Sequence, residues 1–371
     1  MKSYTKYIAA GIILFASFVA TPVVAANGLF DINARKIQLA KPAYAAARQA
    51  CMAVGMKNAE GAAPEPIAGF SSTEAYGSDK RAHPFVWKVM ILSGRVMTND
   101  ATSATELIAL LDTWASARAL EKTEVSHDAY YALKRTMLPT IVAYNIVQDK
   151  MEVEQKKRVK AWLNRLVRRT DKKFNGVVDR NNHRYLADSV LMVWGNIISD
   201  NALYNKGKSR FMTALKDARA DGTLPLETRR GARANWYMRH AATSLTVMAE
   251  AARMRGDNLY AANVNGNTLD TINAAMMNGI NAPASILSYA SENYIPGPSD
   301  DYIAQDDGIL NNRGNGRHYL AYLEAYVKYS RDEFTRARAI ALLNRHAANE
   351  RPLIDEYLGG NGTCFYWEPR S

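Results

Sequence analysis

Two short polar clusters hold the side chains of this sequence that are best suited to chemistry. The first is Asn181-Asn182-His183, which stands just ahead of a long apolar run that starts at Leu186. Either Asn can cap a helix, because its side-chain oxygen accepts a hydrogen bond from a free N–H of the first turn. His183 would then lie in that turn, where the free N–H groups and the helix dipole attract anions. The cluster could bind a carboxylate, but taken alone it is explained more simply by a capped helix with one surface histidine.

The second cluster lies about fifty residues further along the chain. Turn residues and Pro225 precede a helical pattern that we expect to continue to about Met254. The cluster consists of four polar residues on this segment: Arg230, Arg233, Tyr237 and His240. On a continuous helix Arg230 and Tyr237 would lie about 20° from eclipsed, because they are seven residues apart. Cations beside a tyrosine favour its phenolate form, whereas an ordinary basic surface would explain the same residues more simply.

Together the clusters suit the cleavage of a uronic-acid polymer by β-elimination. This reaction requires that the C6 carboxylate be neutralised, so that the proton on C5 becomes acidic. It also requires a base that removes this proton and an acid that protonates the glycosidic oxygen leaving C4. Arginine and asparagine can serve the first need, and tyrosine or histidine can serve the other two. None of these steps calls for a metal ion.

The rest of the chain must position these clusters, and its pattern is helical almost throughout. Apolar residues recur at intervals of three and four in 102–122, 155–169 and 330–348. Strand-like alternation is scarce, and no sequence repeat of fixed period is evident. We therefore expect an all-α fold of antiparallel helix pairs, either stacked or closed into a ring.

Composition and charge narrow the class of partner. The chain has 371 residues, of which 48% are hydrophobic and 22% charged, a composition typical of a globular protein. The net charge of +11 favours a polyanionic partner: nucleic acid, an anionic membrane surface or an acidic polymer. Charge alone does not distinguish these three.

The N-terminus helps to choose among these partners. Residues 1–26 combine Lys2 and Lys6, a short apolar stretch and small residues near Ala25, a pattern typical of a secretory signal peptide. A single membrane anchor is the alternative, but the stretch is short for a membrane span. We expect a periplasmic or secreted protein whose residues 27–371 form one domain. Its partner would be an anionic polysaccharide rather than nucleic acid or, after cleavage, a membrane.

Other features give weaker expectations. Cys51 and Cys364 are the only cysteines, and in an oxidising compartment they could pair or remain two buried thiols. The scattered histidines show no metal-ligand spacing, so we expect neither a metal nor another cofactor. Long loops at 57–80 and 293–319 suit lids or binding loops. Nothing in the sequence specifies an oligomer, so a monomer is the default expectation.

Two motifs resemble a known family. The stretches "NNHRYLADSVLMVWG" and "LPLETRRGARANWYMRHA" are similar to the patterns NNHSYWAAWSVM and LPxExxRGxRALxYHxxA of the alginate lyases of polysaccharide lyase family 5. The separation of the two motifs also agrees with the family spacing. The resemblance implies an α/α barrel (toroid) and cleavage of polymannuronate without a metal. It implies that Asn182, His183 and Arg230 hold the substrate carboxylate and that Tyr237 is the acid and, in a syn-elimination, also the base.

The resemblance implies further contacts with the sugar chain. "TEAYGSDKRA" is similar to the family's lid, which makes Tyr76, Lys80 and Arg81 candidate substrate-binding residues. Three more candidates come from the motifs themselves: Arg184, Arg233 and His240. Arg184 and His240 depart from the family pattern, which has serine and an aromatic residue there. The specificity of the subsites is therefore open between polymannuronate, polyglucuronate and another bacterial polyuronide.

Rival interpretations remain at this stage. A glycoside hydrolase would use two carboxylates, and Asp188 and Glu227 are the nearest candidates, although both are also explained by their places in helices. A non-catalytic polyuronide-binding protein would keep the carboxylate grip, but it would need neither Tyr237 nor His183. For an anti-elimination, as with guluronate or glucuronate, we would make His183 the base and Tyr237 the acid.

Overall fold

Helices make up nearly all of the regular structure. The computed structural model describes residues 28–53, 63–72, 82–170, 172–174, 176–292, 304–313 and 317–369. Its α-helices are α1 (Ile32–Ala40), α2 (Ala45–Met52), α3 (His83–Val96), α4 (Ala101–Ser116), α5 (His127–Val147), α6 (Val153–Thr170), α7 (Asn182–Ile197), α8 (Asn201–Asp217), α9 (Pro225–Thr228), α10 (Ala234–Arg253), α11 (Leu269–Asn281), α12 (Ala284–Ala290), α13 (Leu323–Tyr329), α14 (Glu333–His346) and α15 (Gly362–Tyr366). Strands β1 (Ile354–Asp355) and β2 (Gly360–Asn361) form one short antiparallel hairpin. The all-α expectation is confirmed, and the expected signal peptide (1–26) lies outside the described residues.

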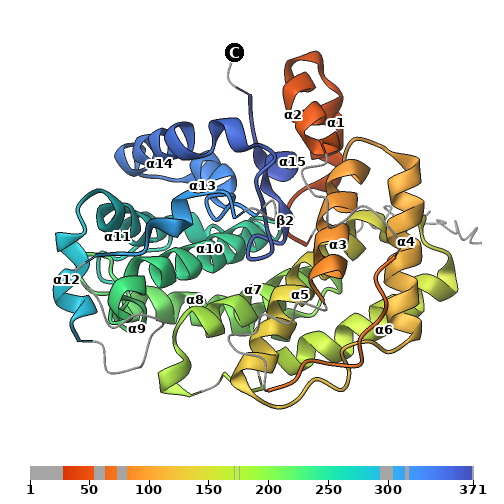
Figure 1. Ribbon diagram of the computed structural model, residues 1–371, viewed down its shortest axis with the longest axis horizontal. Coiled ribbons are helices and arrows are strands. Elements are labelled where there is room, and N and C mark those ends of the chain that lie inside the picture. The colour runs from red at the N-terminus through yellow and green to blue at the C-terminus, as the bar shows by residue number, and fades with distance from the viewer. Residues whose placement is uncertain are drawn as a thin grey trace, which may run out of the picture.

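The helices form an α/α toroid. Inner helices are each followed along the chain by an outer helix that packs against them: α3 by α4, α5 by α6, α7 by α8, α10 by α11 and α13 by α14. The inner helices also contact one another in chain order, from α3 through α5, α7 and α10 to α13. Figure 1 shows these pairs following a curve from α3 and α4 to α13 and α14. The three periodic segments of the sequence are found here as α4, α6 and α14.

The inner and outer helices differ in how much of their surface is buried. Every residue of α10 from Ala234 to Ala252 is buried, and α5 and α7 are nearly as enclosed. The outer helix α6 instead buries a single stripe that includes Trp162 and Leu166. This contrast is expected, because a helix surrounded by others must be compatible with burial all round, whereas a surface helix needs one apolar face. Polar residues on the inner helices therefore need a specific partner or a ligand.

The segment after Pro225 differs from the sequence expectation. Instead of one helix up to about Met254, the structure has the short helix α9, a 3₁₀ turn (Gly231–Arg233) and then α10. Gly231 has φ of 56°, in the left-handed region that glycine adopts without steric cost, so the α-helix cannot run through it. The prediction of an unbroken helix was wrong, and Arg230 lies in the turn rather than on α10.

The C-terminal segment closes the arrangement between the first and last inner helices. Strand β2 packs on α3, and α15 packs on α13 and α2 (Figure 1). Cys51 of α2 and Cys364 of α15 form a disulfide with their Cα atoms 5.2 Å apart, which answers the question that the sequence left open. This segment also contacts α5 and α10. Asp355 pairs with Arg239 of α10 and Glu356 with Arg135 of α5, and the hydroxyl of Tyr357 is hydrogen-bonded to that of Tyr131. A helix long and apolar enough to cross a membrane does not occur in the described part of the chain.

Candidate active site

The first turn of α7 presents a buried amide with no hydrogen-bond partner. Of the two asparagines that could cap the helix, Asn181 does so, its Oδ1 accepting a hydrogen bond of 3.0 Å from the N–H of His183. The N–H of Asn182 donates to Oε1 of Glu227 on α9. The side chain of Asn182 is buried, yet neither its nitrogen nor its oxygen has a hydrogen-bond partner among the described residues. Leaving such groups unmet costs about 1–3 kcal/mol each, so Asn182 marks a place where a ligand or water is expected.

His183 is held between two aromatic rings next to this amide. Its ring stacks on Phe174 with centroids 5.4 Å apart and lies 4.5 Å from the ring of Tyr131. Burial, followed by the charges of Lys134 and Arg230, lowers the pKa of His183 well below its ordinary value. Its Nδ1 has no hydrogen-bond partner among the described residues. A neutral imidazole can donate one hydrogen bond and accept one proton, so His183 can serve either as a carboxylate donor or as a base.

Arg230 and Tyr237 form a close pair across the turn that precedes α10. Nη2 of Arg230 donates to Oη of Tyr237 at 3.2 Å, and Cζ of Arg230 lies 4.2 Å from the centroid of the tyrosine ring. The guanidinium therefore faces both the ring and the hydroxyl. A cation in this position stabilises negative charge that develops on the phenolic oxygen. The pair can thus support a tyrosine that exchanges a proton with a substrate.

His240 lies behind Tyr237 in a cluster of aromatic residues. Nε1 of Trp236 is 3.1 Å from Nε2 of His240, and because an indole N–H can only donate, Nε2 is the acceptor. The ring hydrogen is then on Nδ1, which lies 3.4 Å from Oη of Tyr131. Burial, then the charges of Arg239 and other cations, lowers the pKa of His240 well below its ordinary value, so its ring is neutral. Its centroid is 5.8 Å from that of Tyr237, close enough to support the tyrosine ring.

Two of the predicted substrate-binding arginines are engaged with the protein itself. Nε and Nη2 of Arg184 donate to the backbone carbonyls of Phe174 and Gly176, at 2.7 and 2.8 Å. Arg233 forms an ion pair of 3.1 Å with Asp306 and lies 5.0 Å from the ring of Trp236. Arg184 is buried, so its position suits support of the loop ahead of α7, whereas Arg233 is half-buried. The three lid candidates, Tyr76, Lys80 and Arg81, lie outside the described residues.

Residues that sequence reasoning missed surround the site from α5 and the C-terminal segment. Tyr131 of α5 contacts His183 and His240, and its hydroxyl is hydrogen-bonded to that of Tyr357. Lys134, one turn along α5, donates to the backbone carbonyl of His183 at 2.8 Å. One signal was present in the sequence: Lys134 and Arg135 interrupt a long apolar stretch that forms an inner helix.

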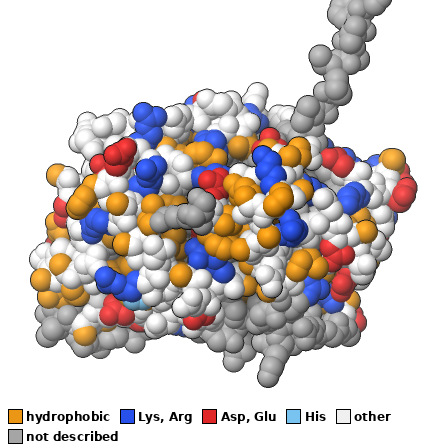
Figure 2. Space-filling model, turned by 90° about the horizontal axis from the view of Figure 1, so that it is seen from above, with side chains coloured by type: hydrophobic (Ala, Val, Ile, Leu, Met, Phe, Trp, Pro, Cys, Tyr) orange, Lys and Arg blue, Asp and Glu red, His pale blue; other side chains and the backbone are white. Residues whose placement is uncertain are grey.

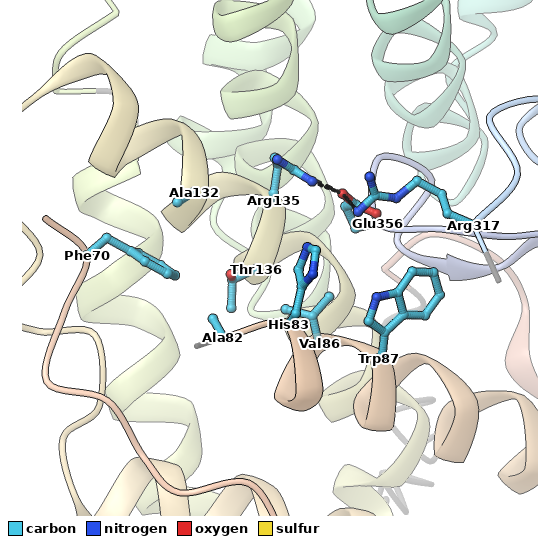
Figure 3. Close-up of a pocket in the computed structure, with 10 residues that line it drawn as sticks. All are labelled: Phe70, Ala82, His83, Val86, Trp87, Ala132, Arg135, Thr136, Arg317 and Glu356. Atoms are coloured by element: carbon cyan, nitrogen blue, oxygen red, sulfur yellow. Dashed lines mark hydrogen bonds and ion pairs between the residues drawn. The ribbon is translucent and has the colours of Figure 1, made fainter. Parts of the chain in front are cut away.

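A pair of arginines and one carboxylate form the wall next to Tyr131. Figure 3 shows Arg135 of α5 and Arg317 pointing toward Glu356 from opposite sides of a pocket whose floor includes His83 and Trp87 of α3. Both arginines form ion pairs with Oε1 of Glu356. Burial alone would raise the pKa of Glu356, but Arg317 and Arg135 outweigh it and lower the pKa to about 2. This wall therefore carries net positive charge, which favours anionic ligands.

The two carboxylates of the hydrolase alternative are both engaged. Asp188 is fully buried, and its Oδ1 forms an ion pair of 2.7 Å with Arg210 of α8. Glu227 is buried against the N–H of Asn182. Both carboxylates are buried and bonded to other groups of the protein, which weighs against a two-carboxylate hydrolase. Within the described residues no group of three or more His, Cys, Asp or Glu side chains is arranged to hold a metal ion.

Comparison with known proteins assigns the chain to a family. The family profile described as alginate lyase matches residues 87–286, just over half of the chain. The chain belongs to the alginate lyase family. The matched range contains Asn182, His183, Arg230 and Tyr237, so the family resemblance inferred from the two motifs is confirmed.

Curated members of the family match part of the chain. A polysaccharide lyase of Stenotrophomonas maltophilia is 31% identical over 189 residues, and an alginate lyase of Pseudomonas syringae pv. tomato is 26% identical over 197 residues. These alignments cover 50% and 49% of this chain, and 56% and 50% of the two relatives. The chain thus spans about half the length of the curated relatives it matches.

Solved structures of family members share the fold over nearly the whole chain. A variant of alginate lyase A1-III in complex with a tetrasaccharide has a TM-score of 0.78 at 22% identity, covering 95% of this chain and 98% of that one. Alginate lyase A1-III from Sphingomonas species A1 gives 0.76 at 21% identity, covering 93% and 98%. An alginate lyase from Bacteroides ovatus gives 0.65 at 15% identity, covering 86% and 96%. This similarity concerns the fold, and the expected α/α toroid is confirmed.

Proposed function

We propose that the protein is a polysaccharide lyase that cleaves a 1,4-linked uronic-acid polymer by β-elimination, with polymannuronate (alginate) as the first substrate to test. The products would be oligosaccharides with a C4=C5 double bond. One observation carries the proposal: the buried, unmatched amide of Asn182 stands beside a neutral His183 and near the Arg230–Tyr237 pair. Family membership and the curated relatives support the same reaction class.

The first step is to hold and neutralise the substrate carboxylate. Asn182 and His183 can each donate one hydrogen bond to it, and Arg230 supplies positive charge. With its carboxylate charge neutralised, the sugar can accept the electron density that develops when the C5 proton leaves. All of these groups come from one chain, so a monomer suffices for the reaction.

The second step is proton transfer at C5 and O4. Tyr237, as phenolate beside Arg230, would remove the C5 proton, the electron pair of the C–H bond would form the C4=C5 double bond, and O4 would leave with the electrons of the C–O bond. In a syn-elimination the same hydroxyl then returns the proton to O4, so no net proton is gained or lost. With a guluronate or glucuronate polymer, His183 would remove the proton and Tyr237 would protonate O4. No step in this scheme is assigned to a metal ion.

We further propose that the protein acts in the periplasm or outside the cell on an anionic polysaccharide. The pattern of residues 1–26 and the net charge of +11 support this location and this partner. Figure 2 shows Lys and Arg side chains scattered among hydrophobic ones over one face of the molecule. Fractionation of cells that express the full chain tests the location: signal cleavage and recovery with periplasmic or external markers are expected, and retention in the cytoplasm would refute it.

The decisive experiment follows ultraviolet absorbance, because the C4=C5 double bond of the product absorbs where the polymer does not. The purified protein is incubated with polymannuronate, polyguluronate, polyglucuronate and hyaluronate, with and without a chelator. Tyr237→Phe is compared with Tyr329→Phe, because Tyr329 also lies under an arginine. Cζ of Arg253 is 3.2 Å from the centroid of the Tyr329 ring. Arg253 and Tyr237 lie at opposite ends of α10, about 24 Å apart along the helix.

Each outcome has a distinct meaning. Absorbance should rise with the wild type and with Tyr329→Phe, both with and without the chelator, but not with Tyr237→Phe. This result would support the lyase function and identify the polymer that it cleaves. New reducing ends without absorbance would favour a hydrolase. Binding without new ends, in the wild type and in both variants, would favour a polyuronide-binding protein that does not turn over.

A further inference from the structure

Glu227 lies directly behind the residues that would bind the substrate carboxylate. It is 1% exposed on the short helix α9. Its Oε1 accepts the hydrogen bond from the N–H of Asn182, and its Oε2 has no hydrogen-bond partner among the described residues. The elimination described above gives this carboxyl group no role. A buried carboxyl with one unmatched oxygen, placed on the backbone of a candidate catalytic residue, requires an explanation.

The charges that face Glu227 leave it poised between two protonation states. Arg229 and Arg230 follow it along the chain. Tyr185 of α7 is near enough that, besides burial, the charge of Glu227 raises its pKa, although its hydroxyl donates to the carbonyl of Arg180. Burial raises the pKa of Glu227 to about 8, although Arg230, the N–H of Asn182 and Arg229 all act in the opposite direction. With a pKa of about 8, the neutral form of this carboxyl is accessible near neutral pH.

We propose that Glu227 is a positioning residue: in its neutral form it holds Asn182 for the substrate, and in its ionised form it opposes binding of the substrate carboxylate. The inference rests on the proposed lyase function. Glu227 is bonded to the N–H of Asn182, and Arg230, the cation that acts on it most strongly, would also hold the substrate carboxylate. Two like charges that share one site resist being ionised together.

The neutral acid can still hold Asn182 in place. The carbonyl oxygen of a protonated carboxyl accepts a backbone hydrogen bond, as does the amide oxygen of a glutamine. As pH rises, Glu227 loses its proton and its negative charge begins to repel the substrate. Binding should therefore weaken toward alkaline pH, and a glutamine at this position should remove that weakening.

The test compares four proteins on the polymer that the wild type cleaves. KM and kcat are measured between pH 6 and 9 for the wild type, Glu227→Gln and Glu227→Ala. Glu250→Gln is the matched control, because Glu250 is another buried carboxyl with its pKa raised, to about 7, near the far end of α10. We expect KM of the wild type to rise about tenfold across this range, with a flat profile in Glu227→Gln and an unchanged one in Glu250→Gln.

Glu227→Ala separates the hydrogen bond from the charge. Its KM should be about tenfold higher than that of the wild type at pH 6, because Asn182 loses its anchor. Circular dichroism checks that the variant folds, and if it does not, the Glu227→Gln profile decides alone. A Glu227→Gln protein with the wild-type pH profile, or one as impaired as Glu227→Ala at pH 6, would overturn the proposal.

Failure of the lyase proposal is distinguishable from failure of this one. If the wild type forms no product on any polymer, calorimetric titration with a mannuronate or glucuronate tetrasaccharide replaces the kinetics. Affinity that falls with pH in the wild type but not in Glu227→Gln would still support the role of Glu227. Affinity with the same pH dependence in both proteins, or no binding of either oligosaccharide, would refute it.

Discussion

Arg230 and Tyr237 meet across a turn between two helices rather than along one continuous helix. The guanidinium Nη2 lies 3.2 Å from the phenolic oxygen although α10 begins only at Ala234. The turn at Gly231 folds Arg230 back over the tyrosine ring. The contact therefore combines a cation over the ring with a hydrogen bond to the hydroxyl, and the several N–H groups of a guanidinium suit both.

Arg230→Lys should lower kcat/KM about a hundredfold. An ammonium group keeps the charge but cannot lie flat on the ring and donate to the hydroxyl at the same time. Arg253→Lys is the matched control, since Arg253 stacks on Tyr329 near the other end of the same helix. Steady-state kinetics check the prediction, and an Arg230→Lys enzyme within twofold of the wild type would show that charge alone suffices.

His183 should make the protein less stable as the pH falls. A histidine in the unfolded chain gains a proton near pH 6.5, whereas burial and nearby cations lower the pKa of His183 in the folded protein. Below that pH the unfolded state binds more protons, so the free energy of unfolding declines by up to about 1.4 kcal/mol per pH unit. Urea unfolding of His183→Gln at pH 7.5 and 5.5 should show a smaller decline. His127→Gln, at a largely exposed position, should leave the wild-type decline in place.

Sequence reasoning anticipated the helix that carries Asn182 and His183 because its signals are local. The cap at Asn181 and the apolar stripe of α7 depend on neighbouring residues, and the structure shows both. The pairing of Arg230 with Tyr237 was also anticipated, but from helical spacing, which was the wrong reason. Two residues close in sequence can meet through several backbone paths, so spacing alone did not reveal the turn at Gly231.

The rest of the site could not be predicted because it is assembled from distant segments. Tyr131 and Tyr357 share a hydrogen bond although 226 residues separate them. Their meeting depends on how the C-terminal hairpin closes against the inner helices, which no local pattern encodes. For the same reason, nothing in the sequence indicates that Arg184 bonds to loop carbonyls or that Arg233 pairs with Asp306.

Glu250→Gln should stabilise the protein at alkaline pH. Burial raises the pKa of Glu250 to about 7, so this carboxyl contributes stability below the unfolded value near 4.5, and the contribution is lost as pH rises through 7. A glutamine is neutral at every pH and can still accept the 2.8 Å hydrogen bond from Tyr260. The free energy of unfolding at pH 8 should rise by about 1–3 kcal/mol relative to the wild type. Glu333→Gln, at an exposed position of α14, is the control, and an equal gain there would contradict the prediction.

The Cys51–Cys364 disulfide should stabilise the protein without serving the reaction. It links α2 to α15 across 313 residues of chain, so it restricts the unfolded state strongly. A Cys51→Ala/Cys364→Ala double variant should lose about 2–5 kcal/mol of unfolding free energy. Its kcat/KM at 25 °C should stay within about twofold of the wild type, because neither cysteine contacts the site. A reducing agent should destabilise the wild type and leave the double variant unchanged, and equal sensitivity of both would contradict the role assigned to the bond.

Arg184 should act on catalysis through the loop that carries Phe174. Arg184→Met keeps the side-chain stem but loses the hydrogen bonds to the carbonyls of Phe174 and Gly176. Phe174 would then no longer hold the ring of His183 in place. We expect kcat to fall about tenfold with a smaller change in KM.

Arg169→Met is a matched control for this substitution, because Arg169 likewise donates to two loop carbonyls, those of Glu121 and Thr123. It should lower the free energy of unfolding by a similar amount, about 1–3 kcal/mol, and leave kcat unchanged. If Arg184→Met instead raised KM and left kcat intact, Arg184 would bind the substrate directly, as its place in the motif suggests. The ratio of the two effects therefore distinguishes an arginine that touches the sugar from one that holds the histidine beside it.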